Sequence, residues 1–143
     1  MDAKNIIMNF STPPSAEDLL VIAGEILENM PDELVEYCDD ISIVCDEIPD
    51  EALEQELDLD DPFDLLAVYR SGGEISPGVQ KKIADEDDVL MLFRRPILDM
   101  WCETGEDLFT IMRSVVIEEI ARYHDFTDDE IEVILKTHHQ AML

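Results

Sequence analysis

The chain has 143 residues, of which 46% are hydrophobic, with only 5 glycines and 7 prolines, so it has the size and composition of a single globular domain. Its 36 acidic and 9 basic side chains leave a formal net charge of -27, which repels phosphate backbones and anionic lipid surfaces and disfavours nucleic acid and membranes as partners. Apolar runs are too short to cross a bilayer and no secretory signal is recognisable, so we expect a cytoplasmic protein.

The first half of the chain predicts helices followed by strands. Residues 1–14 are expected to form a flexible lead, and residues 15–143 a single domain. Ser15 and Asp18 form a capping-box pattern, which opens an amphipathic helix that reaches about Asn29. A short helical stretch follows Pro31. Further along, we expect a strand over 41–47, a short helix and a loop over 50–64, a strand over 65–70, a turn over 71–73, a long polar connection over 74–88 and a strand over 89–94.

The second half is expected to be helical after Pro96. A first piece over 97–102 is followed by a break and then by a long helix over 108–123, which is apolar on more than one side and should run through the core. Thr127 and Glu130 form a second capping-box pattern, which opens the last helix. This order predicts an α+β fold, with a small mixed sheet of about three to four strands packed on helices around a long central helix.

The cysteines predict neither disulfides nor a metal site. Cys38, Cys45 and Cys102 lie far apart in the sequence, so we expect buried thiols in a reducing compartment. Met100 and Trp101 fall in a helix and are also expected in the core.

Three segments resemble a family of small bacterial proteins described as minimal zincin-like metallopeptidases. They are residues 61–69 (DPFDLLAVY), 90–99 (LMLFRRPILD) and 103–108 (ETGEDL), and the similarity runs in the same order from about Ala16 to Ile134. The resemblance implies a zincin-like fold whose long helix bears the motif H-E-x-x-H. In that motif two histidines bind zinc and the glutamate activates a water molecule.

This chain departs from the motif at both histidine positions. The resemblance places Glu118 and Arg122 where the family has its zinc ligands, Glu119 at the catalytic glutamate, and Asp128 in a turn that could supply a third ligand. A guanidinium cannot bind zinc, because it has only donors and keeps its proton. We therefore expect no zinc cofactor, a vestigial Glu119, and a degenerate metal site at Glu118, Arg122 and Asp128.

The histidines present are not expected to restore a metal site. His124 lies about 200° around the helix from Arg122 and faces away from the family site. His138 and His139 are adjacent and lie near the terminus, so they do not face one target.

Two arrangements of the remaining charges stay open. Glu118, Glu119 and Asp128 together could hold a hard cation through oxygen ligands. In the other arrangement, the Arg122 guanidinium replaces the metal and bridges Glu118 and Asp128. At the end of the third predicted strand, Arg94 and Arg95 are expected either to pair with carboxylates of the helices behind them or to contact a ligand.

The sequence therefore favours an inactive zincin-like homologue that keeps the fold and binds a peptide or a basic protein. Two alternatives remain. One is an active metal-dependent hydrolase with a non-standard metal site, and the other is an acidic adaptor or decoy that binds basic proteins.

Overall fold

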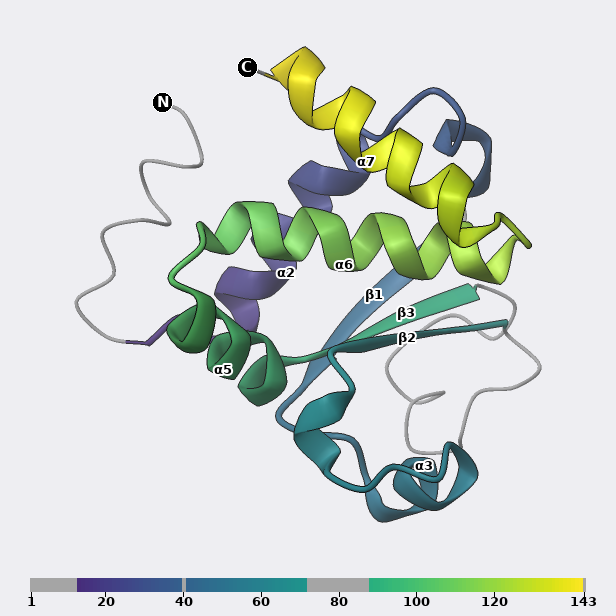
Figure 1. Cartoon of the computed structure of the whole chain (residues 1–143). Helices are drawn as coiled ribbons and strands as arrows, with labels where there is room; N and C mark the ends of the chain where they lie inside the picture. Colours follow the sequence, from purple (N-terminus) through teal and green to yellow (C-terminus); the bar gives the residue numbers. More distant parts are fainter. Residues whose placement is uncertain (1–12, 40, 72–87, 143) are drawn as a thin grey trace.

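A computed structural model describes residues 13–39, 41–71 and 88–142 of the chain, and side chains within these ranges up to residue 137. It confirms the α+β class, and none of the described helices is long and apolar enough to cross a membrane. In chain order (Figure 1) the elements are α2 (Ala16–Glu28), the 3-10 turn η1 (Val35–Tyr37), β1 (Ile41–Asp46), α3 (Glu51–Glu56), the 3-10 turn η2 (Pro62–Asp64), β2 (Ala67–Arg70), β3 (Asp88–Phe93), α5 (Arg94–Thr104), α6 (Leu108–Tyr123) and α7 (Asp128–Met142).

The sheet has the order β1-β3-β2, so the last strand in the sequence is the central one. Strand β3 runs parallel to β1 and antiparallel to β2, which confirms a small mixed sheet. All three predicted strands are present, and none of their ends differs from prediction by more than two residues. The expected turn and the polar connection before β3 lie almost wholly outside the described residues.

One face of the sheet is packed on helices. Leu90 and Leu92 of β3 face the main core, whereas Val89 and Met91 belong to a smaller apolar cluster, as the alternation of side chains along a strand requires. Helix α2 packs on β1 and α6 packs on β2. Helix α6 lies between the sheet and α7 (Figure 1).

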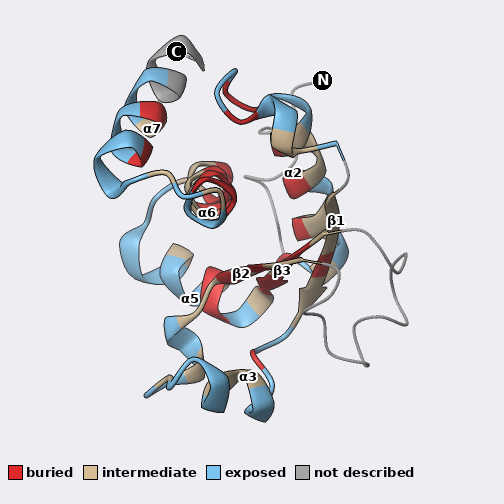
Figure 2. Ribbon diagram, turned by 90° about the vertical axis from the view of Figure 1, so that its right-hand side faces the viewer, coloured by how far each residue is buried: buried red, intermediate tan, exposed pale blue. Residues whose placement is uncertain are grey.

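Helix α6 is the core of the domain, as its apolar pattern predicts. It begins where the carboxylate of Asp107 accepts a hydrogen bond from the Thr110 N–H at 3.1 Å. In Figure 2, α6 is seen between α7 on one side and α2 on the other. Its buried residues are Leu108, Phe109, Ile111, Met112, Arg113, Val116, Ile117, Ile120 and Ala121.

Both predicted capping boxes form. Ser15 and Asp18 exchange hydrogen bonds at the start of α2, and Thr127 and Glu130 do the same at the start of α7. Helix α5 begins at Arg94, two residues before Pro96, so the expected start after the proline is wrong. Proline fits in the first turn of a helix because the N–H that it lacks would have no helical partner there.

Helix α6 ends in a Schellman motif. The Phe126 N–H donates to the Ala121 carbonyl at 3.0 Å, and the Asp125 N–H donates to the Arg122 carbonyl at 3.2 Å. Asp125 adopts the left-handed conformation, with φ of 65°, that this motif requires. Glycine is the usual residue at this position, since a side chain there is strained. The Asp125 carboxylate also lies at the negative end of the helix.

We predict that Asp125→Gly stabilises the protein. The change removes both the strained Cβ and a negative charge from the helix end, and should raise the free energy of unfolding by about 0.5–1 kcal/mol, or Tm by about 2–4 °C. Asp125→Asn should give only part of this gain, because it removes the charge alone. Thermal unfolding measures both, and a lower Tm for Asp125→Gly would show that the aspartate itself is needed.

Candidate functional site

A cleft of about 450 Å³ opens between the segment that leads into β2, helix α5 and helix α6. Its apolar lining comes from all three segments, and its charged groups are mainly carboxylates. The lining residues are Asp64, Leu65, Leu66, Ala67, Met100, Glu106, Ile111, Ser114, Val115, Glu118, Glu119 and Arg122. The cleft thus combines an apolar lining with four carboxylates and one guanidinium.

An ion pair on α6 lies within the cleft. Nη1 of Arg122 is 3.4 Å from Oε1 of Glu119, and the exposed fractions of the two side chains are 55% and 23%. Among the described residues no ion pair joins Arg122 to Glu118 or Asp128, so the expected bridge is wrong. Glu119, three residues before Arg122 on the same helix face, takes the place that Glu118 was expected to have.

Burial sets the acidity of Glu119. The loss of water around the carboxylate raises the pKa of Glu119 to about 6, Arg122 opposes the rise, and Glu118 adds to it. Glu119 therefore takes up a proton more readily than an exposed glutamate, and it does so beside the only guanidinium that lines the described cleft.

A family model described as zincin-like metallopeptidase matches residues 38–137. The chain belongs to this family. A comparison with curated proteins finds no match. The matched range includes β1 to most of α7, and therefore every residue that lines the cleft.

Zinc does not fit the residues that this zincin-like chain presents in the cleft. Within the described part of the chain, no three His, Cys, Asp or Glu side chains are placed to hold one metal ion. Glu118 and Glu119 line the cleft, but Asp128 begins α7 and does not line it. Arg122 offers donors only. The described carboxylates therefore do not assemble the hard-cation site that the sequence left open.

His124 lies outside the zincin-like cleft, in an aromatic cluster. It caps the end of α6, and its ring stacks on Tyr37 with 4.0 Å between centroids and 16° between planes. The rings of Tyr69 and Tyr123 meet it edge-on. Its Nε2 is buried with no hydrogen-bond partner among the described residues. This packing joins η1, β2 and α6. The side chains of His138 and His139 lie outside the described residues.

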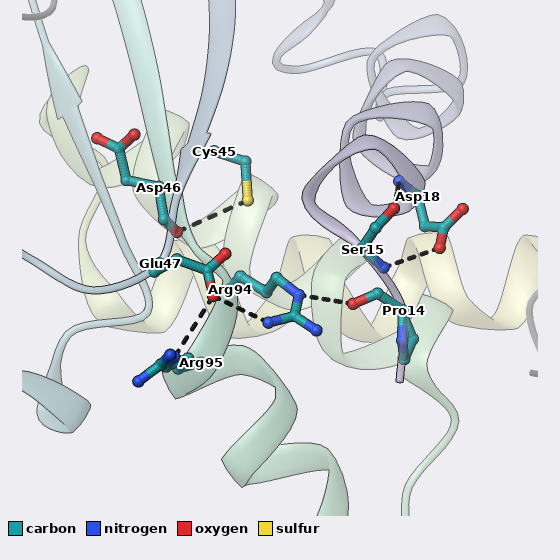
Figure 3. Close-up of polar contacts among 8 residues, drawn as sticks. All are labelled: Pro14, Ser15, Asp18, Cys45, Asp46, Glu47, Arg94 and Arg95. Carbon is teal, nitrogen blue, oxygen red and sulfur yellow. Dashed lines mark hydrogen bonds and ion pairs between the residues drawn. The ribbon is translucent and has the colours of Figure 1, made fainter. Parts of the chain in front are cut away.

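Arg94 and Arg95 begin α5, directly after β3, and do not line the cleft. The Arg94 guanidinium donates to the carbonyl of Pro14 at 2.7 Å and to the carboxylate of Glu47 at 2.9 Å, and Arg95 donates to the same carboxylate at 3.4 Å (Figure 3). Glu47 follows β1, so the expected partners on the helices behind are wrong. Arg94 ties the chain before α2 to the sheet, and contact of either arginine with a ligand stays a prediction.

All three cysteines are free thiols, and Cys38 and Cys45 are not activated as nucleophiles. Burial raises the pKa of Cys38 to about 11 and that of Cys45 to about 12, so both stay protonated near neutral pH. Both are partly buried, whereas Cys102 is exposed, contrary to the expectation that all three are buried.

Sequence reasoning missed the wall of the cleft opposite α6. Met100 was expected in the core, but it is 37% exposed and lines the cleft. Asp64 and Glu106 gave no functional signal, because they belong to a 3-10 turn and an interhelical connection that only the tertiary structure brings together. On α6, Glu118 and Arg122 are one helical turn apart and both line the cleft.

We predict that Glu119→Gln stabilises the protein at neutral pH. Folding raises the pKa of Glu119 from 4.5 to about 6, because the buried carboxyl group is more stable when it is protonated. The contribution of this carboxyl group to the free energy of unfolding is therefore fully present below pH 4.5, and it is lost as the pH rises through about 6. Glutamine has no charge to bury, so the variant should gain about 1–2 kcal/mol over the native protein well above pH 6.

The gain should vanish below pH 4.5, where both proteins are neutral at this position. Urea unfolding over this pH range measures it. Glu103→Gln, at an exposed position of α5, corrects for the general relief of charge repulsion. Equal gains in the two variants would contradict the burial of Glu119.

Proposed function

We propose that this zincin-like protein binds an extended peptide in the cleft between β2 and α6, and that it does not hydrolyse the peptide by zinc chemistry. The principal support is the Arg122 guanidinium, which pairs with Glu119 inside the cleft and stands where the family resemblance expects a zinc-binding histidine. A fixed cation supplied by the chain leaves no reason for a metal to balance the cleft carboxylates.

The edge of β2 offers backbone groups to a peptide. The Phe93 N–H donates to the Leu66 carbonyl, so alternate residues of β2 direct their backbone groups toward β3. The backbone groups of Ala67 and Tyr69 consequently face the other side, where no described strand pairs with β2. An added strand there would lie beside the cleft, since Ala67 also lines it.

The negative charge of the cleft favours a basic peptide. Four carboxylates, from Asp64, Glu106, Glu118 and Glu119, line the cleft against one guanidinium. A lysine or arginine side chain of the ligand would complement them, and apolar side chains would pack on Leu66 and the neighbouring apolar lining. The proposed ligand is therefore an extended segment with both basic and apolar residues.

A library of unstructured synthetic peptides tests binding and cleavage together. We expect the protein, with zinc added, to retain basic peptides and to create no new peptide termini, as mass spectrometry would measure. Glu118→Lys should weaken retention about tenfold, whereas Glu103→Lys, which makes the same charge change at an exposed position of α5, should not. Cleavage that a chelator and Glu119→Gln both abolish would establish an active metallopeptidase instead.

Restoring the family motif provides a second test. The double variant Glu118→His with Arg122→His has the sequence H-E-x-x-H, in which two imidazoles share one helix face. We expect it to bind zinc measurably in calorimetry, while the native chain and each single variant bind it far more weakly. A double variant that folds but has no affinity for zinc would refute the assignment of these positions.

A further inference from the structure

A second hollow lies beside α7 and shares no lining residue with the cleft. Its volume is about 360 Å³, which is near the lower end of the roughly 300–1,000 Å³ that ligand pockets occupy. We call it the α7 groove. It is lined by three apolar residues, Phe126, Val133 and Ile134, and by three acidic ones, Glu33, Asp129 and Glu130.

The apolar floor of the α7 groove is held in place before any partner arrives. The Phe126 backbone is fixed by the Schellman motif at the end of α6, and its ring packs edge-on against Tyr37, with 6.3 Å between centroids. Ile134 is only 4% exposed. A preformed floor lowers the ordering cost of binding, so it favours recognition of an apolar side chain.

Val133 is an apolar side chain that the described residues leave largely exposed. Helix α7 buries Ile131 and Ile134 against the domain, but it leaves Val133 62% exposed at the groove. An exposed apolar side chain that continues an apolar groove gains free energy when a partner covers both.

Charge decides between the possible occupants. A second copy of the chain also bears a net charge of -27, so the two copies repel each other, and anionic lipid and nucleic acid are repelled in the same way. At the rim, Glu130 accepts a hydrogen bond from the Thr127 N–H, which lowers the pKa of Glu130 and keeps it ionised. A basic protein segment is the occupant that this rim attracts.

We propose that the α7 groove binds a short amphipathic segment of a partner protein, with a large apolar side chain seated on Phe126 and Val133 and lysine or arginine residues beside Glu33 and Asp129. This site is separate from the cleft. It does not depend on the function proposed for the cleft.

Fluorescence anisotropy with a labelled amphipathic peptide of leucine and lysine tests the groove on the full chain. We expect binding at physiological ionic strength, about tenfold weaker binding of a peptide of alanine and lysine with the same charge, and about tenfold weaker binding by Val133→Ser. Val21→Ser is the matched control, because Val21 on α2 is 64% exposed, and it should bind like the native protein. Met100 lines the cleft and not the α7 groove, so Val133→Ser should weaken binding by the same factor in the Met100→Ser background.

Four outcomes would overturn the proposal. Equal affinity for both peptides would show attraction by charge alone. An unchanged affinity in Val133→Ser would place the peptide elsewhere on the surface. Loss of the Val133→Ser effect in the Met100→Ser background would place the peptide in the cleft. A dimer in sedimentation that Val133→Ser disrupts would identify a second copy of the chain as the occupant.

Discussion

The burial of α6 is the constraint on which the other features depend. It packs on β2 of the sheet and on helices α2, α5 and α7, so it has little freedom to rotate or slide. The same fixed rotation leaves one stripe, from Ile111 to Arg122, facing the cleft. The core therefore positions the charged side chains of the cleft, because packing fixes their helix.

The cleft contains a carboxylate that is largely buried and has one cation beside it. Glu119 is three-quarters buried and still carries a charge above pH 6, which is costly without a nearby cation. Arg122 reduces that cost from within the chain. This cation is covalently part of the chain, and it keeps its proton at every physiological pH.

Local signals in the sequence predicted local structure well. The α6 helix begins and ends as expected because Asp107 caps it and its apolar residues recur throughout its length. Features that depend on contacts between distant segments were missed. Met100 was expected in the core because an apolar side chain in a helix is usually buried. Glu118 lies four residues before Arg122, a spacing that favours an ion pair on a helix, but this spacing says nothing about the burial of Glu119. The opposite wall of the cleft needed the tertiary structure.

The place of β3 in the sheet has a consequence for the growing chain. Strands β1 and β2 never pair with each other, and both use the backbone of β3. During synthesis from the N-terminus, none of the three described strands can pair until β3 (Asp88–Phe93) is made. Until then the edges of β1 and β2 are open to other chains, which is a known route to aggregation. Carboxylates are concentrated around α3, between β1 and β2 in the sequence. Their charge repels other copies of the incomplete chain, so it would oppose aggregation until β3 has been made.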